Sequence, residues 1–187
     1  MQARCQHEKL LGGLLASRLL QFRGMNAWPF ITLVLSALAI GAPFAHALEM
    51  PARRAYDPAL YVTVTHTLYR YFGIVGGMIE VGAVAAAVIW AVGRWRTSPA
   101  SARGWAATGA ACLVLAHVLF WLLIAPVNEA FAAWTPTAVP PDWTRFRDQW
   151  EFTHAVRAGL FLLGFCAILA SVLAFRPARV RRGETTG

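Results

Sequence analysis

Four long apolar runs, separated by short polar segments, constrain this chain more than any other feature of its sequence. Each run holds about 20 residues, the length that an α-helix needs to cross the hydrocarbon core of a bilayer. Most of the runs begin or end at an aromatic residue, as membrane-spanning helices often do at the interface. We therefore predict an all-α fold, a four-transmembrane-helix bundle with spans at about residues 28–48, 71–92, 105–127 and 154–175.

Composition agrees with a membrane protein. Of the 187 residues, 58% are hydrophobic and only 14% are charged, whereas an average soluble domain carries about 25% charged residues. The three cysteines form neither a metal-ligand spacing nor a disulfide framework. The net charge of +8 does not indicate a nucleic-acid partner, because the basic residues lie in segments that determine membrane orientation. The lipid bilayer is the expected partner.

The distribution of charge predicts this orientation. The N-terminal arm, the link after the second span and the C-terminal tail together hold eleven basic and two acidic residues, whereas the other two loops hold five basic and six acidic residues. Cytoplasmic loops of membrane proteins carry the excess of Lys and Arg. We expect a multi-pass protein of the cell membrane with both termini cytoplasmic and with two outward-facing loops.

The chain divides into three expected parts. Residues 1–24 are a basic amphipathic arm, or an extension upstream of a start at Met25 rather than at Met1. Residues 25–176 form the membrane domain, and residues 177–187 form a basic cytoplasmic tail. The Ala-His-Ala pattern at residues 45–47 also fits a signal-peptide cleavage site, but we interpret the first run as a spanning helix.

The outer loops are predicted to contain amphipathic helical segments. In the first loop, Asp57 precedes Pro58, an arrangement typical of a helix N-cap followed by the first helical position. Alternation of apolar residues at 60, 62 and 64 also allows a short strand there. The second loop, WTPTAVPPDW, is rich in proline, and Asp142 is expected to cap the helix that continues into the fourth span. Such loops could cover a pocket.

Two ionisable residues interrupt the apolar spans. Glu80 in the second span and His117 in the third are each about 15 Å from the same predicted membrane surface. A Glu–His pair at this depth would offset the desolvation of both groups. Ionisable residues inside a membrane are functional candidates, and the alternative is a structural hydrogen bond between helices.

The remaining polar residues fall at helical spacing on single faces of the predicted helices. His117, Trp121 and Asn128 share one face of the third span, and Tyr69 shares a face with Glu80. Another face carries Arg147, Trp150, His154 and Arg157 from the last loop into the fourth span. All of these groups gather in the outer half, as does His46 of the first span. We predict a polar pocket there.

The segment from the third to the fourth span resembles the anthrone-oxygenase-like family of small four-helix membrane proteins. The resemblance rests on APVNEAFAAW followed by RDQWEFTHAVRAGL, with Asn128, Trp134, Trp150, His154 and Arg157 at the matching positions. Gln149 stands where the family pattern leads us to expect a basic residue. The resemblance implies oxygenation of a reduced tricyclic aromatic compound to a quinone.

An enzyme of this kind would oxidise or bind an apolar aromatic or quinol-like molecule that enters from the lipid. His154 would act as general base or as a hydrogen-bond partner to a phenol, Arg157 and Arg147 would stabilise a phenolate, and Asn128 would orient it. The expected ligand-binding side chains are Trp134, Trp150, Trp121, Tyr69 and Glu80.

The cofactor stays open at this point. No cofactor is one possibility, and a metal ion is another, with His46, His117, His154 and Glu80, or Glu49 in place of Glu80, as candidate ligands. The alternative function is a non-catalytic membrane accessory or structural subunit, also within a larger membrane complex, whose polar cluster only locks the helices.

Overall fold

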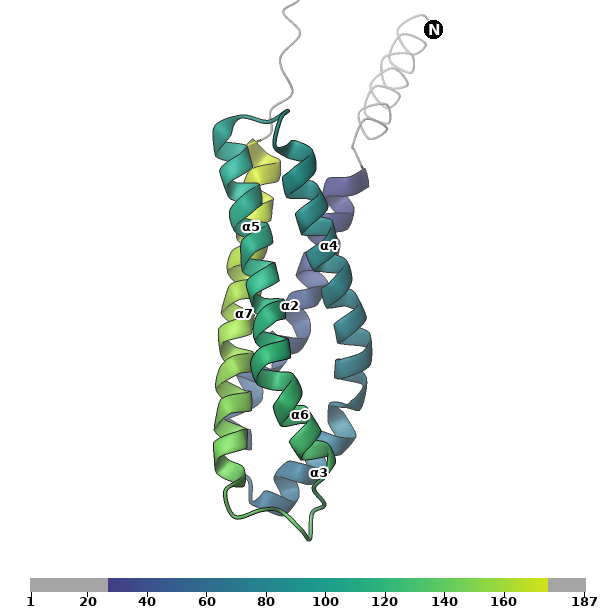
Figure 1. Cartoon of the computed structure of the whole chain (residues 1–187), viewed down its shortest axis with the longest axis vertical. Coiled ribbons are helices and arrows are strands. Elements are labelled where there is room, and N and C mark those ends of the chain that lie inside the picture. Colours follow the sequence, from purple (N-terminus) through teal and green to yellow (C-terminus); the bar gives the residue numbers. More distant parts are fainter. Residues whose placement is uncertain (1–26, 175–187) are drawn as a thin grey trace, which may run out of the picture.

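A computed structural model gives the structure of this protein and describes residues 27–174. The predicted arm at 1–24 and the predicted tail at 177–187 lie outside the described residues. The described part is an elongated bundle of helices that run along its long axis (Figure 1). Residues 27–174 contain no β-strand, and the only strand-like pairing among them is an isolated bridge between Thr135 and Ala138.

The helices follow one another in a simple up-and-down order. Two of the elements are single π-helical turns, written η, which continue directly into α-helices. The elements are α2 (Ala27–Arg53), α3 (Pro58–Leu68), η1 (Phe72–Gly76), α4 (Gly77–Arg94), α5 (Ala100–Leu119), η2 (Phe120–Ile124), α6 (Ala125–Ala132) and α7 (Trp143–Ala174).

Four of the described helical segments are long and apolar enough to cross a membrane, which confirms the predicted all-α bundle. They are Ala27–Arg53, Phe72–Arg94, Ala100–Ala132 and Trp143–Ala174. Large apolar side chains are exposed all along their outer surface, including Phe30 at 61%, Val92 at 70% and Leu173 at 70%. Such a surface suits lipid and not water. The protein is therefore a multi-pass membrane protein.

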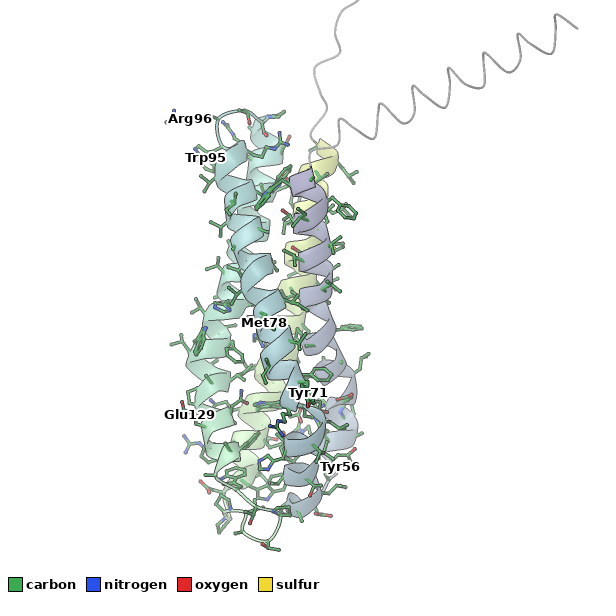
Figure 2. The ribbon with its side chains drawn as sticks, turned by 90° about the vertical axis from the view of Figure 1, so that its right-hand side faces the viewer. Tyr56, Tyr71, Met78, Trp95, Arg96 and Glu129 are labelled. Atoms are coloured by element: carbon green, nitrogen blue, oxygen red, sulfur yellow. The ribbon has the colours of Figure 1, made fainter. Side chains whose placement is uncertain are left out.

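The two ends of the bundle differ, and we name them by what they carry. At the link end, the segment between α4 and α5 carries Trp95 and Arg96; the opposite end, the α3 end, carries α3 and Tyr56 (Figures 1 and 2). The predicted helix after Asp57 is confirmed as α3, and Asp57 Oδ1 accepts a hydrogen bond from the backbone N–H of Leu60 at 2.9 Å. The alternative of a short strand there was wrong.

The spanning helices are longer than their apolar cores. The first was predicted to end at residue 48, but α2 continues through Pro51 to Arg53. The fourth was predicted from residue 154, but the helix already begins at Trp143, as expected for a helix that starts in the loop. Hydropathy detects only the apolar run of a helix, so the polar turns that extend α2 and α7 toward the α3 end escape it.

The helices α5 and α7 pack very closely through small residues. A Cβ atom added to Gly164 would lie 2.2 Å from Leu113 Cδ1, and one added to Gly109 would lie 2.6 Å from Ile168 Cγ1. Neither position has room for a side chain. Small residues at helix contacts let backbones approach each other in membranes, so this part of the bundle is closed.

The second and third spans each contain a π-helical turn in the half nearer the α3 end. Turn η2 ends two residues before Pro126, which has no backbone N–H and cannot continue the α-helical hydrogen-bond pattern. Beyond this point the chain bends, and α6 runs toward α3 (Figure 1). Turn η1 lies in the glycine-containing stretch that opens the second span. Single π-turns inside α-helices are frequent at functional sites.

A buried ion pair joins α2 to α7 near the α3 end. Arg53 and Glu151 are each 1% exposed. Arg53 Nε donates to Glu151 Oε1 at 2.7 Å, and Nη2 donates to Oε2 at 2.5 Å, a bidentate arrangement. The hydroxyl of Tyr61 on α3 donates to the same carboxylate at 3.1 Å. Three helices are thus held at one point.

The remaining donors of Arg53 are also satisfied. Its Nη2 donates to the backbone oxygen of His46 at 2.8 Å. Its Nη1 donates to Glu49 Oε2 at 2.6 Å and to the hydroxyl oxygen of Tyr69 at 2.7 Å. Tyr69 in turn donates to the Glu49 carboxylate. A buried guanidinium with this many partners is compensated for its desolvation.

We expect the substitution Glu151→Gln to destabilise the bundle by about 3 kcal/mol, because it leaves the charge of Arg53 buried without its main counter-ion. The measurement is the free energy of unfolding in mixed micelles, followed by far-UV circular dichroism during titration with a denaturing detergent.

The matched control is Asp148→Asn, three residues earlier on the same helix. Asp148 pairs with Arg147 and Arg54, but its side chain is 48% exposed. Removal of an exposed pair should change stability by at most about 1 kcal/mol. Equal effects of the two substitutions would contradict the role assigned to the buried pair.

Candidate functional site

A cavity of about 1020 Å³ lies inside the half of the bundle nearer the α3 end. Its lining residues belong to α2, α3, η1, α4, the last turn of α5, η2, α6 and α7 and to the segment between α3 and η1. The small residues that close α5 against α7 do not extend into this half. Volumes of this size accommodate a drug-sized ligand.

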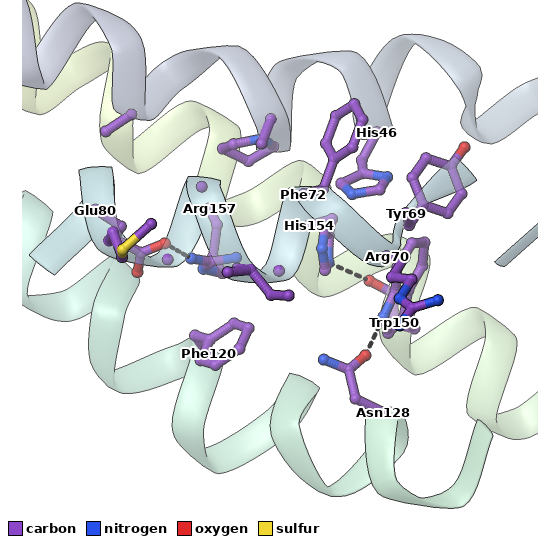
Figure 3. Close-up of a pocket in the computed structure, with 18 of the residues that line it drawn as sticks. His46, Tyr69, Arg70, Phe72, Glu80, Phe120, Asn128, Trp150, His154 and Arg157 are labelled. Atoms are coloured by element: carbon purple, nitrogen blue, oxygen red, sulfur yellow. Dashed lines mark hydrogen bonds and ion pairs between the residues drawn. The ribbon is translucent and has the colours of Figure 1, made fainter. Parts of the chain in front are cut away.

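Most of the side chains that the sequence analysis selected line this cavity. They are His46, Tyr69, Glu80, His117, Trp121, Asn128, Trp150, His154 and Arg157. Figure 3 shows the Glu80–Arg157 pair toward one end of the cavity, Tyr69 and Asn128 toward the other, and His154 between them. Their roles in binding or catalysis remain predictions, but the structure brings them to one interior space.

Glu80 is the centre of a charged network at the end of the cavity that is farther from α3. Its Oε2 accepts a hydrogen bond from Arg157 Nη2 at 2.5 Å, and its Oε1 is 2.9 Å from His117 Nδ1. The predicted pair of Glu80 and His117 is therefore confirmed, with Arg157 as a third member. Arg157 Nε donates to the backbone oxygen of Ala116 at 2.9 Å, so α4, α5 and α7 meet here.

The hydrogen bonds of His117 identify its tautomer. The indole Nε1 of Trp121 is 3.0 Å from His117 Nε2, and an indole N–H can only donate. His117 Nε2 must then accept and carries no proton. His117 Nδ1 carries the proton and donates it to Glu80. Both ring nitrogens of this histidine are occupied, so it has no free nitrogen for a metal or a substrate.

His154, in contrast to His117, has one ring nitrogen without a hydrogen-bond partner among the described residues. Its Nδ1 is 3.2 Å from the backbone oxygen of Trp150, and because a carbonyl oxygen only accepts, Nδ1 is the donor. The ring stacks on Trp150 at a centroid distance of 4.2 Å, and Trp150 Nε1 donates to Asn128 Oδ1 at 2.9 Å. In the neutral ring, Nε2 is an acceptor, and it makes no hydrogen bond to any described residue.

His46 completes an aromatic wall around His154. Its ring meets His154 edge-on at 4.4 Å and Trp150 at 4.7 Å, and it also contacts Tyr69 and Phe72. The Nδ1 atom of His46 is buried without a hydrogen-bond partner. An unpaired buried acceptor is tolerated better than an unpaired N–H, which favours a proton on Nε2. His46 would then present a donor beside the acceptor of His154.

The tyrosines at the α3 end stay protonated over a wide pH range. Burial and the hydrogen bond to Glu49 raise the pKa of Tyr69 to about 12. Burial, together with the neighbouring Glu151 carboxylate, raises the pKa of Tyr61 well above its ordinary value. Neither phenol is suited to act as a base near neutral pH. Their hydroxyl groups are donors that hold the carboxylates around Arg53.

Two of the selected residues do not line the cavity. Arg147 hydrogen-bonds to Asp148 Oδ1 at 2.9 Å and to the backbone oxygen of Arg54, and its guanidinium lies 5.0 Å from the Trp143 ring centroid. Trp134 packs against Phe131 and Phe146. Arg147 and His154 lie on one helix at the predicted spacing. The cavity reaches His154 but does not extend as far as Arg147.

The candidate metal ligands separate into three groups. His117 pairs with Glu80, whereas His46 contacts His154, and Glu49 belongs to the Arg53 network. Among the residues that the structure describes, no three His, Cys, Asp or Glu side chains form a group that could hold a metal ion.

Several residues that shape the site were not predicted from the sequence. Arg70 and His66 line the cavity, as do Phe72 and Phe120, and no motif distinguishes them in the sequence. Arg53 could have been found: it follows His46 by seven residues and so shares its helix face. The seven-residue spacing places His46 and Arg53 on one face only if the helix continues through Pro51.

The mouth of the cavity opens between the second and third spans. Five of the lining side chains are apolar and more than half exposed. Ile74, Met78, Val81 and Trp121 belong to the second and third spans, and Leu38 belongs to the first. Exposed apolar side chains at these positions would face lipid, so the cavity communicates with the hydrocarbon region.

The fold and the site define a class: a four-helix multi-pass membrane protein with a polar, aromatic-lined cavity. A family model described as "Anthrone oxygenase" matches residues 65–167, more than half of the chain. The chain belongs to this family. The matched range contains every cavity-lining residue outside α2. No curated protein and no solved structure matches the chain.

We expect His117 to be observed as the neutral Nδ1–H tautomer, because both of its ring nitrogens have defined partners. The measurement is ¹⁵N NMR of histidine-labelled protein in nanodiscs, in which protonated and bare ring nitrogens resonate far apart. Trp121→Phe should shift the Nε2 signal of His117 and leave that of His154 in place. A proton on Nε2 in the parent protein would contradict the assigned network.

Proposed function

We propose that the cavity binds a flat, hydroxylated tricyclic aromatic ketone of the anthrone type and that the protein oxidises its methylene carbon with dioxygen. The family description names this substrate class. The observation that carries the proposal is the environment of His154. Its Nε2 makes no hydrogen bond to the part of the chain that the structure describes, its ring lines an aromatic cavity, and Arg157 lines the same cavity.

Recognition of such a ligand rests on the aromatic wall and on free polar atoms. Trp150 and Phe120 offer ring faces and edges for stacking. Arg157 uses its Nε and one Nη2 proton on Ala116 and Glu80, so further N–H groups of its five remain for a ligand oxygen. The Glu80 carboxylate keeps this guanidinium in position.

The first step is removal of a proton from the methylene carbon by His154 Nε2. The electron pair of the broken C–H bond delocalises into the ketone, and the negative charge develops on its oxygen. A guanidinium at this oxygen stabilises the enolate that forms. Arg157 supplies that positive charge from within the cavity, where low polarity strengthens the interaction.

The second step is oxidation by dioxygen, the co-reactant. The carbanion carbon forms a bond to one oxygen atom, and the imidazolium of His154 returns its proton to give a hydroperoxide. His154 then removes the second methylene proton while the O–O bond breaks, and water leaves. The carbon loses four electrons and becomes a carbonyl, dioxygen gains four, and one of its atoms is released as water.

Access is from the lipid, through the mouth between the second and third spans. The exposed apolar side chains of Ile74, Met78 and Val81 border this opening. An apolar tricyclic compound concentrates in a bilayer, so lateral access delivers it without passage through water. The mouth also admits dioxygen, which is likewise more soluble in hydrocarbon than in water.

The orientation that fits this proposal places the α3 end on the outer side of the cell membrane. Arg94, Arg96 and Arg103 cluster about the link end. By the positive-inside rule that end is cytoplasmic. The cavity would then lie in the outer half of the membrane.

We expect Gly77→Leu to occlude the cavity and to weaken binding of a hydroxyanthraquinone by at least tenfold, about 1.4 kcal/mol. Gly77 lines the cavity, and a Cβ atom added to it meets nothing within 4 Å. The side chain would therefore extend into open space without disturbing the helix. Binding is measured by quenching of tryptophan fluorescence in nanodiscs.

The control is Gly159→Leu on α7, where an added Cβ also meets nothing within 4 Å but the residue does not line the cavity. This variant should bind like the parent protein. Equal binding by the parent, by Gly77→Leu and by empty nanodiscs would contradict the proposal and favour the alternative of a non-catalytic bundle.

We expect His154→Gln to retain binding within a few-fold but to lower the rate of anthrone oxidation by about 10² to 10⁴, the usual contribution of a general base. The measurement is dioxygen uptake together with quinone absorbance after addition of an anthrone, corrected for the spontaneous reaction. Retention of the full rate by this variant would exclude His154 as the base.

A further inference from the structure

Arg70 is a cation at the cavity without a counter-ion among residues 27–174. Apart from the histidines and Tyr69, whose phenol stays neutral, three ionisable side chains line the cavity: Arg70, Glu80 and Arg157. Glu80 and Arg157 neutralise each other through their 2.5 Å contact. The lining therefore carries one uncompensated positive charge, and it belongs to Arg70.

The carboxylates near Arg70 are engaged elsewhere. Glu49 and Glu151 both bind Arg53. Glu129 on α6 is exposed and does not line the cavity. Within residues 27–174, Arg70 makes no hydrogen bond and no ion pair, and it is exposed at the cavity. Its five N–H donors are open to a ligand.

The position of Arg70 in the membrane restricts the ligand that it could bind. It lies between the end of α3 at Leu68 and the start of the second span at Phe72, at the boundary of the apolar region. Figure 3 shows it at the end of the cavity opposite the Glu80–Arg157 pair, with His154 between them. An elongated ligand would thus have an anionic group at the boundary and its rings in the hydrocarbon.

We propose that the ligand is an aromatic carboxylic acid and that Arg70 binds its carboxylate while the ring system occupies the cavity beside His154. The proposal rests on the function proposed above and narrows its substrate class from anthrone-type compounds to acidic ones. A planar guanidinium binds carboxylate with two parallel hydrogen bonds. This contact also sets the direction in which the ligand lies.

The walls favour an aromatic acid over a lipid acid. Tyr69, Phe72, Phe131 and Trp150 contribute rings to the half of the cavity that contains Arg70, and stacked or edge-to-face ring pairs prefer a flat partner. A fatty acid offers the same carboxylate but no ring. The two sources of a carboxylate are separated by competition.

The test compares two isosteric probes, anthraquinone-2-carboxylate and anthraquinone-2-carboxamide, in nanodiscs of zwitterionic phosphatidylcholine. The full-length protein should bind the carboxylate about tenfold more tightly than the carboxamide after subtraction of binding to empty discs. In Arg70→Gln this preference should vanish through weaker binding of the carboxylate, with the carboxamide unchanged. Arg70→Lys should restore part of the preference, since it keeps the charge and loses the bidentate geometry.

Arg147→Gln is the matched control, because Arg147 lies toward the same end of the bundle but is paired with Asp148 and does not line the cavity. It should keep the carboxylate preference. A preference that is equal in the parent protein and Arg70→Gln would overturn the proposal while the function proposed above stands. Absence of binding of both probes to the parent would overturn both. In a competition measurement, unlabelled aromatic acid should displace the bound probe more strongly than palmitate does. The reverse order would overturn the assignment of an aromatic ligand.

Discussion

The ion pair between Arg53 and Glu151 is the constraint on which the architecture of the α3 end depends. Two charges cannot be removed from water inside a bundle unless each donor and acceptor finds a partner. Arg53 satisfies this requirement by drawing α2, α3 and α7 to one point. The same guanidinium lies 5.2 Å from the ring centroid of Tyr69 and 5.3 Å from that of Trp150. Because His46 lies two turns before Arg53 and Trp150 directly precedes Glu151, the ion pair places the rings that form the cavity wall.

The bundle contains two charged clusters, and they differ in how completely their donors are used. Around Arg53, every donor nitrogen has a partner, so the cluster is a closed structural joint of the kind that polar residues form between membrane helices. Arg157 donates to one carboxylate and one carbonyl oxygen, and the other N–H groups of its guanidinium make no hydrogen bond to the described residues. The closed cluster gives rigidity, and the open one borders a cavity. The idea that polar residues only lock the helices therefore describes the first cluster well and the second incompletely.

The division between a closed half and a hollow half follows from the size of the buried residues. Gly109 and Gly164 bring α5 and α7 into backbone contact, and the adjoining core consists largely of alanine, with Leu113, Phe161 and Ile168. Toward the α3 end the core instead contains Tyr61, Phe131 and Trp150. Large rings hold helices apart, and the π-helical turns η1 and η2 redirect the backbone where the spacing changes. A cavity with aromatic walls results.

The sequence by itself determined that this chain is a bundle of four membrane-spanning helices, that α3 begins at the Asp57 cap, and that Glu80 and His117 meet. Each of these conclusions depends on a local residue pattern or on the position of a residue along a straight helix. Both kinds of information can be read from the order of residues in the chain. The tertiary structure alone decided that Arg53 is buried, that Arg70 lines the cavity unpaired, and that Arg147 and Trp134 lie outside it. Counting residues along one helix specifies a face, but which helix lies opposite that face depends on the kink at Pro126, the extension of α2 past Pro51 and the close packing at Gly164. These are properties of the assembled bundle, because they arise from contacts between segments far apart in the chain.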